Sequence, residues 1–287
     1  MRKKQVVSII LICAILAALT ALLLGRKSTK GTLSPFSATF LKVGKADAII
    51  LECEGMTMVI DTGEEDDGQE LVDTLREKHI SQIDILVITH YDKDHVGGAD
   101  TLLSQIPVVK VLVPDYEGSI TDYAEFVAAL KQASMTSEAV NERLSFPFGN
   151  AFVTIDPPKS YQVPVSSVEY DNNFSLVATI THGDVRMLFT GDIEKERIKE
   201  MIADGQLQEC DFLKFPHHGI YNTALSDLLE TVRPRFAVIF SSDKNPAEPM
   251  TLELLKKYGV DILETRRGKI TLLSDGRNIE LHQKIRH

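Results

Sequence analysis

Short apolar runs and amphipathic stretches alternate along most of the chain. Runs of apolar or β-branched residues bounded by glycines or polar turns predict strands over residues 40–43, 49–52, 56–60, 85–88, 108–113, 175–180, 185–189, 212–215 and 236–240. Apolar residues at helical spacing predict helices over residues 69–78, 99–104, 121–133, 193–203, 223–232 and 251–258. This mixture predicts an α/β protein whose sheets are covered by helices on their outer faces.

The N-terminal pattern differs from the rest. Residues 6–24 form an almost unbroken apolar run after three basic residues, and at roughly 1.5 Å per helical residue the run is long enough to cross the hydrocarbon layer. It ends in leucines rather than in the small residues typical of a cleavage site. We therefore expect a membrane anchor or signal segment over residues 1–28, a linker over 29–35 and a catalytic domain over 36–287.

The location of that domain follows from the same segment. The signal-like start favours a membrane-anchored protein with an extracytoplasmic catalytic domain, although basic residues flank the run on both sides. If the segment is cleaved, the protein is secreted.

The charge and cysteine content narrow the chemistry. With 31 Lys and Arg against 41 Asp and Glu, the chain lacks the basic footprint of a tight duplex DNA binder. A nuclease stays possible, because metal ions in a cleft supply local positive charge. Only Cys53 and Cys210 follow the anchor, so a disulfide framework and a cysteine zinc cluster are excluded. Any metal needs His and carboxylate ligands.

The densest group of ligand-type residues directly follows the predicted strand 85–88. His90, Asp92, Asp94 and His95 lie within six residues. A solvated polar loop explains one or two such residues but not four. The spacing lets one loop serve two adjacent metal ions.

Three further groups stand at predicted strand ends. Asp61 is placed to orient a metal-binding imidazole by accepting its free ring N–H. Asp192 follows Gly191, and a carboxylate there can bridge two cations. His217 and His218 are adjacent and point to different sides, so we expect only one of them to bind metal.

The motifs, and the order in which they follow one another along the chain, resemble those of the metallo-β-lactamase superfamily. The similarity extends from about residue 40 to 273 and is greatest to the branch with the hydrolase domain of the DNA-uptake channel ComEC and phosphorylcholine esterases. The matching motifs are Phe40 to Gly44 with Asp47-Ala48, Asp61-Thr62-Gly63, His90 to Gly98, Asn172 to Val177, Phe189 to Asp192 and Leu213 to Gly219. The resemblance implies an αββα sandwich with a dinuclear metal site along one edge.

It also implies a role for each matching residue. His90 and Asp92 would bind one divalent ion and Asp94 and His95 the other, with Asp192 as the bridge, His218 completing the second site and His217 as a substrate or proton-transfer group. Asp61, Asp94 and His217 are the catalytic candidates. The ions would be zinc or manganese; Asp92, which stands where the wider superfamily has His, favours manganese or iron.

Two departures from the superfamily pattern weaken the expected site. Asn172 or Asn173 stands where a third ligand histidine is usual, and Glu248 lies in a segment where relatives carry His before Pro. Glu248 either ligates, binds substrate through water or marks lost activity. His182 sits in a predicted hairpin turn, where we expect a solvated residue rather than a ligand.

Together these features predict a metal-dependent phosphodiesterase or nuclease-like enzyme with a metal-activated water. The expected substrate is a phosphoester, such as single-stranded DNA or a small phosphodiester, and we infer no obligate protein partner. The alternatives are a β-lactam or other carbonyl hydrolase, because the fold hosts several reactions, and a catalytically weak extracytoplasmic binding module.

Overall fold

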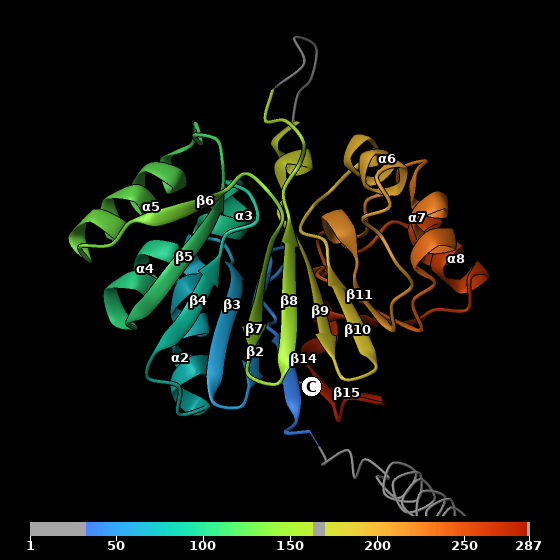
Figure 1. Ribbon diagram of the computed structural model, residues 1–287, viewed down its shortest axis with the longest axis horizontal. Helices are drawn as coiled ribbons and strands as arrows, with labels where there is room; N and C mark the ends of the chain where they lie inside the picture. Colours follow the sequence, from blue (N-terminus) through green and yellow to red (C-terminus); the bar gives the residue numbers. More distant parts are fainter. Residues whose placement is uncertain (1–32, 163–169, 286–287) are drawn as a thin grey trace, which may run out of the picture. The chain divides into compact units, whose positions relative to one another are not determined.

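Two β-sheets face each other, with helices on both outer faces, in the computed structural model, which describes residues 33–162 and 170–285 (Figure 1). This is the αββα layering that the family resemblance implies. Over these residues, no helix combines the length and apolarity needed to span a bilayer. The predicted anchor lies outside the described residues, and the unit described below begins at Ser34.

The first sheet has the strand order β15-β14-β1-β2-β3-β4-β5-β6. Its strands are β1 (Phe36–Phe40), β2 (Ala48–Cys53), β3 (Met56–Thr62), β4 (Ile83–Val87), β5 (Val108–Pro114), β6 (Ser137–Val140), β14 (Gly268–Ser274) and β15 (Ile279–Ile285). β3 to β6 run parallel. Beside them lie α2 (Gly68–Glu77), α3 (Lys93–Val96), α4 (Ala99–Gln105) and α5 (Thr121–Gln132) (Figure 1).

The second sheet has the order β13-β12-β11-β10-β9-β8-β7. Its strands are β7 (Leu144–Phe148), β8 (Ala151–Asp156), β9 (Val177–His182), β10 (Val185–Phe189), β11 (Phe212–Lys214), β12 (Phe236–Ile239) and β13 (Asp261–Glu264). On its outer side lie α6 (Lys195–Ala203), α7 (Leu225–Val232) and α8 (Pro249–Lys257). Short 3-10 turns are η1 (Glu65–Asp67), η2 (Tyr170–Phe174), η3 (Pro216–Gly219) and η4 (Thr265–Arg267).

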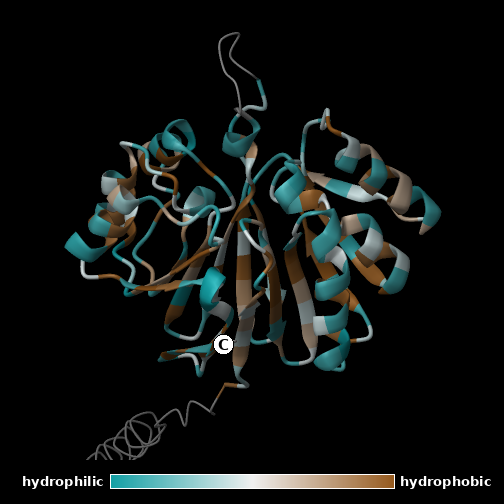
Figure 2. Cartoon of the chain, turned by 180° about the vertical axis from the view of Figure 1, so that it is seen from behind, coloured by the Kyte–Doolittle hydropathy of each residue, from teal (hydrophilic) through white to brown (hydrophobic). Residues whose placement is uncertain are grey.

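Successive side chains of a strand point to opposite faces of the sheet, and this alternation divides the hydrophobic core into two layers. In β10, Met187 and Phe189 face the layer between the sheets, whereas Leu188 belongs to the cluster beneath the helices of the second sheet. Phe189 stacks on Phe40 of the opposite sheet, with ring centroids 6.2 Å apart. Hydrophobic colour accordingly concentrates on the strands, and the helices turn hydrophilic sides outward (Figure 2). Two such sheets present the ends of several strands at one edge of the sandwich.

The structure corrects two expectations about local structure. The strand predicted over residues 40–43 is β1, which ends at Phe40; Leu41 and Val43 are buried in the following loop, so apolar character there reflects burial and not strand pairing. His182 is not a solvated turn residue. It closes β9, is fully buried, and its ring nitrogens lie 3.0 Å from Ser274 Oγ and 3.1 Å from the Ser34 carbonyl oxygen.

Candidate metal centre

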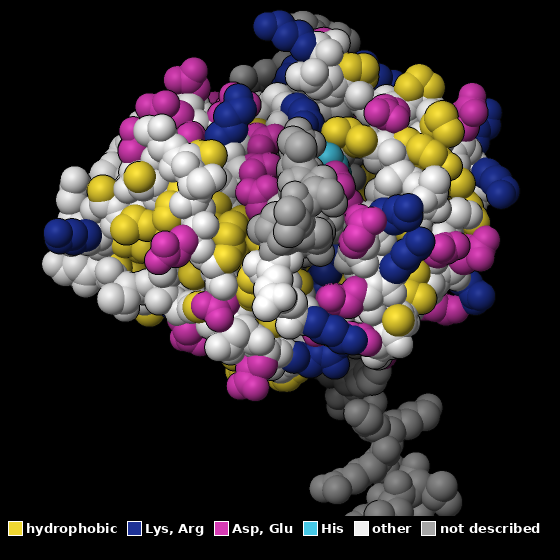
Figure 3. Space-filling model, turned by 90° about the horizontal axis from the view of Figure 1, so that it is seen from above, with side chains coloured by type: hydrophobic (Ala, Val, Ile, Leu, Met, Phe, Trp, Pro, Cys, Tyr) yellow, Lys and Arg dark blue, Asp and Glu magenta, His cyan; other side chains and the backbone are white. Residues whose placement is uncertain are grey.

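Five separate segments bring ligand-type side chains to one edge of the sandwich. Asp61 lies in β3, and the histidine and aspartate loop follows β4. Asp192 follows β10, and η3 follows β11. The loop between β1 and β2 adds Asp47. Seen from above, acidic side chains and a histidine lie close to one another near the middle of this face (Figure 3).

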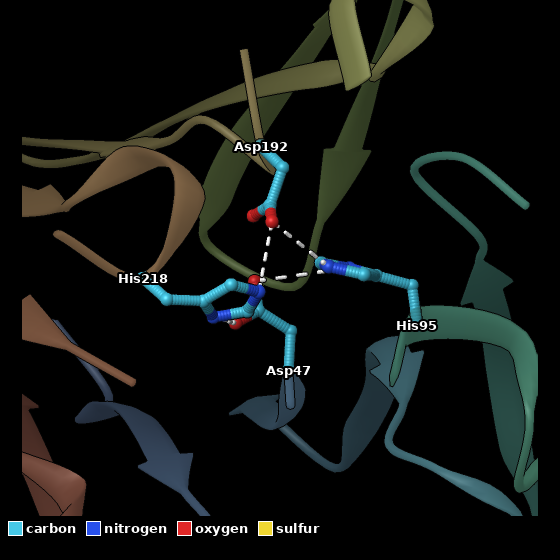
Figure 4. Close-up of side chains that lie close together, drawn as sticks. All are labelled: Asp47, His95, Asp192 and His218. Carbon is cyan, nitrogen blue, oxygen red and sulfur yellow. Dashed lines mark ion pairs between the residues drawn. The ribbon is translucent and has the colours of Figure 1, made fainter. Parts of the chain in front are cut away.

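Asp47, His95, Asp192 and His218 form what we call the inner group. Each offers one ligand atom, and these atoms lie within 4.8 Å of one another. Asp192 Oδ2 is 2.8 Å from His218 Nε2 and 3.3 Å from His95 Nε2. The four side chains point toward a common centre (Figure 4). All four are buried, and buried charges of this kind are stable only when paired or metal-bound.

The donor atoms of the inner group fit a divalent metal ion. Among the described residues, His95 Nε2, both ring nitrogens of His218 and Asp47 Oδ1 are buried and meet no hydrogen-bond partner, and their close contacts are ion pairs within the site. Buried polar atoms are normally satisfied, whereas imidazole nitrogens and carboxylate oxygens are ordinary ligands of zinc and of other divalent ions. We infer that these atoms are arranged for metal binding.

A buried lysine braces the inner group. Lys214 Nζ contacts Asp47 Oδ2, lies 3.2 Å from Asp192 Oδ1 and donates to the Gly191 carbonyl at 2.9 Å. One oxygen of each carboxylate is thus held by the ammonium, while Asp192 Oδ2 faces the imidazoles. Burial alone would lower the pKa of Lys214, but Asp47 and Asp192 outweigh it and raise that pKa.

The charges of the inner group reinforce one another. Burial would raise the pKa of Asp192, but His218, His95 and Lys214 hold it well below its usual value. Burial would lower the pKa of His95 and of His218, yet Asp192 is the strongest opposing influence and both are raised. Asp47 differs, because burial dominates and raises its pKa. A metal ion must therefore displace protons from the imidazoles as it binds.

Asp61 orients the His95 ring through Nδ1, the ring nitrogen that does not face Asp192. Its Oδ2 lies 2.8 Å from His95 Nδ1 and accepts from the Thr89 hydroxyl at 2.7 Å, while Oδ1 accepts from the Thr89 amide at 2.7 Å. This contact favours the tautomer that presents His95 Nε2 to the centre. Asp61 has a left-handed backbone with φ of 57°, which a non-glycine residue adopts at some energetic cost.

Beside the inner group lie His90 and Asp92, with His90 Nε2 3.6 Å from Asp92 Oδ2. The His90 and His95 ring centroids are 4.1 Å apart, so two metal positions would be neighbours. Asp94 Oδ2 is 3.3 Å from His218 Nε2. Asp94 therefore lies on the side of the inner group, and its sharing of an ion with His95 stays a prediction.

His217 is not a member of the inner group and contacts Glu194. Its Nδ1 lies 2.9 Å from Glu194 Oε1, and its Nε2 is 3.5 Å from Asn172 Nδ2. Asn172 Nδ2 also donates to Glu194 Oε1 at 3.3 Å. An Nδ1–H that donates to Glu194 leaves Nε2 as the acceptor, which suits a proton-transfer group. The hydrogen bond from His217 lowers the pKa of Glu194.

Two sequence candidates have other contacts. Glu248 Oε2 accepts a hydrogen bond from the Tyr221 amide at 3.2 Å, and Glu248 is the N-cap residue of α8. Its carboxylate thus stabilises the loop after η3 and is not part of the inner group. Asn173 Oδ1 accepts from the amides of Glu194 and Arg197 at 3.0 and 3.2 Å, which caps the start of α6.

The residues that sequence reasoning left without a role are Asp47, Lys214 and Glu194. Asp47 occurs in a recognised motif, but nothing local assigns it to the metal centre. Lys214 carried a usable signal, since a lysine between Leu213 and Phe215 in an apolar strand is either exposed or paired inside the protein.

Known proteins share this sequence pattern. The sequence profile described as "Metallo-beta-lactamase superfamily" matches residues 41–242. "ComE operon protein 3" of Bacillus subtilis is 27% identical over 198 residues, which is 68% of this chain and 25% of that protein. "Recombination protein 2" of Haemophilus influenzae is 28% identical over 211 residues, 72% of this chain and 24% of that protein. The chain thus spans about a quarter of the length of these relatives.

Solved structures share the fold. The metallo-β-lactamase fold protein YhfI of Bacillus subtilis has a TM-score of 0.52 at 11% identity, covering 86% of this chain and 100% of that one. CmlA of Streptomyces venezuelae, described as a diiron β-hydroxylase, has a TM-score of 0.50 at 14% identity, covering 81% of this chain and 53% of that one.

Proposed function

The chain belongs to the metallo-β-lactamase superfamily and is a ComEC-like, metal-dependent hydrolase, and from that premise we propose that it hydrolyses phosphodiesters. One observation carries the proposal: carboxylates outnumber imidazoles around the candidate metal positions. The carboxylates belong to Asp47, Asp92, Asp94 and Asp192, and the imidazoles to His90, His95 and His218. Oxygen-rich sites suit manganese better than nitrogen-rich ones do.

Different residues would have different roles in the proposed hydrolysis. When bound, divalent ions polarise the phosphoryl oxygens and activate water for in-line attack. Asp61 fixes the His95 ring, and Lys214 fixes Asp47 and Asp192, so the donor atoms are in place before substrate arrives. His217, held by Glu194, accepts or returns a proton beside the site.

The proposed substrate is single-stranded DNA or a small phosphodiester. The names "ComE operon protein 3" and "Recombination protein 2" belong to those relatives, and they support nucleic acid as the first substrate to examine. The net charge of −10 argues that the metal ions, and not a basic surface, would attract phosphate. We further propose that the domain acts outside the cytoplasm, attached through residues 1–28.

The test compares two substrate classes on one preparation. Full-length protein loaded with manganese or with zinc would be assayed against bis-p-nitrophenyl phosphate and against a chromogenic cephalosporin. Faster turnover of the phosphodiester supports the proposal. Turnover of the cephalosporin alone would make the chain a lactam hydrolase, and the phosphodiesterase assignment would be wrong.

A second candidate is a binding module with little catalysis. Lys214 favours it, because an ammonium already neutralises part of the inner group and reduces its need for a metal ion. This candidate predicts bound metal without turnover of either substrate.

A further inference from the structure

A second lysine lies at the edge of the metal centre. Lys45 Nζ is 4.0 Å from Asp94 Oδ2, the carboxylate oxygen that is also 3.3 Å from His218 Nε2. The Lys45 side chain is 30% exposed and that of Asp94 15%, whereas the Lys214 side chain is 1% exposed. Lys45 is therefore close to the candidate ligand atoms and is still reached by solvent, so an incoming anion can meet it.

The backbone around Lys45 is held in place. The loop that joins β1 and β2 turns at Gly44, whose φ is 73°, and continues into Asp47, which is buried. The Asp47 amide donates to the Asp94 carbonyl oxygen at 3.0 Å, and the Asp47 carbonyl oxygen accepts from the Gly63 amide at 2.8 Å. These hydrogen bonds tie the loop to the segment that carries Asp94, so the fold determines that Lys45 lies beside that carboxylate.

The contact with Asp94 leaves Lys45 able to bind a second anion. The separation of 4.0 Å is long for an ion pair, and among the described residues Lys45 has no other ion-pair partner. A lysine ammonium has three donors. By contrast, Lys214 contacts two carboxylates and a carbonyl oxygen inside the protein. Lys45 therefore keeps capacity for a further anionic ligand.

The site has a use for such a cation. A phosphodiester is an anion, whereas this protein carries a net charge of −10 and its candidate metal ligands include several carboxylates. An ammonium that donates a charged hydrogen bond to a phosphoryl oxygen strengthens binding more than a neutral donor does. A lysine that both solvent and substrate can reach therefore suits recognition of the phosphate charge.

We propose that Lys45 is a substrate-binding residue, whose ammonium binds a non-bridging oxygen of the phosphodiester and selects anionic substrates. The inference rests on the proposed function and deepens it, because it names the residue that recognises the phosphate charge. Lys45 acts as a positive charge and hydrogen-bond donor and is not a metal ligand.

Three variants of the full-length protein, loaded with manganese, test the assignment. Lys45→Met removes the charge, Lys45→Arg keeps it, and Lys42→Met changes an exposed lysine of the same loop as the matched control. KM for bis-p-nitrophenyl phosphate should rise about tenfold in Lys45→Met, because a charged hydrogen bond is lost, while kcat changes less than about threefold. Lys45→Arg should stay within about threefold of wild type, since a guanidinium also binds phosphate. Lys42→Met should match wild type.

Binding without turnover gives an independent readout. The phosphorus NMR relaxation that bound manganese causes reports the dissociation constant of dimethyl phosphate. This constant should rise about tenfold in Lys45→Met and stay unchanged in Lys42→Met. Manganese content, measured by inductively coupled plasma mass spectrometry, should be the same in wild type and all three variants.

The possible outcomes separate this inference from the proposed function. An unchanged KM and dissociation constant in Lys45→Met would overturn the inference and leave the phosphodiesterase intact. A fall in kcat or in manganese content with KM unchanged would also overturn it, because Lys45 would then act through Asp94. If wild type binds dimethyl phosphate without hydrolysing the diester, the proposed function fails, and weaker binding by Lys45→Met still supports the role of Lys45. Neither binding nor turnover in wild type would overturn both.

Discussion

The inner group and the pair of His90 and Asp92, which we call the outer group, are neighbours built in different ways. The inner side chains are 0–3% exposed and are braced by Lys214 and Asp61, whereas the Asp92 side chain is 35% exposed. The inner group therefore has compensating charges without a metal ion, while the outer group has one carboxylate beside a buried imidazole nitrogen, His90 Nε2, that makes no hydrogen bond among the described residues. The difference teaches that contacts with Lys214 and Asp61 hold the inner position in place, whereas the outer position is more open to solvent.

The largest effect should come from breaking the inner group at its shared carboxylate. Asp192→Ala removes the oxygen that faces both imidazoles, and His95→Ala removes one imidazole. Because metal catalysis supplies several kcal/mol of transition-state stabilisation, phosphodiester turnover should fall about 10³-fold or more. Circular dichroism should show a retained fold, with Asp66→Ala as the exposed control. Turnover near the wild-type rate in either variant would remove the inner group from the mechanism.

Removing the lysine tests whether preorganisation distinguishes the two groups. Lys214→Met leaves Asp47 and Asp192 without their cation, and breaking a buried pair of this kind costs about 3–5 kcal/mol. Urea unfolding should show this loss in metal-free protein and a smaller loss with manganese present. Lys110→Met, at the half-exposed pair with Glu138, should change stability little. Equal stability of Lys214→Met and wild type without metal would refute preorganisation.

A substitution at Asp61 should have a smaller effect, and it should affect metal binding by the inner group alone. Asp61→Asn removes the charged acceptor of His95 and should weaken binding of the inner ion about 10–100-fold. Calorimetric titration with manganese should show one weakened site and one unchanged site. If both sites weaken equally, the two groups are not independent.

The smallest effect should come from outside both groups. Glu194→Gln keeps an acceptor for His217 but removes its charge, so kcat should fall about tenfold while metal affinity and KM stay constant. Glu196→Gln, at an exposed position in the first turn of α6, just after Glu194, is the control. A change in metal affinity would place Glu194 with the ligands and not with proton transfer.

The sequence predicted the parts of this centre that local pattern determines. Ligand-type residues directly after apolar strands, such as His90 and Asp192, could be found because parallel strands present their ends at one edge. Glu194 could not, since its role depends on its contact with His217, which is distant in the sequence. Lys214 is similar: a lysine in a strand indicates an exposed face or a buried partner, and only the fold shows Asp47 beside it.

The fold shows the same limit. The order of strands and helices predicted sheets covered by helices, the family resemblance implied the αββα layering, and a strand was expected directly after Arg267, where β14 begins, but β15 was not predicted. β15 pairs along the outer side of β14 and alternates exposed and half-buried residues, so its sequence resembles a solvated segment. Its pairing comes from a neighbouring strand and not from its own hydrophobicity.

The central claim is phosphodiester hydrolysis that depends on metal ions in these two groups. The most direct measurement is turnover of bis-p-nitrophenyl phosphate by the full-length protein before chelation, after chelation and after manganese is restored. The account predicts loss of turnover with the metal and its return as metal content rises. Turnover that persists in metal-free protein, or its absence with both positions filled, would contradict the account.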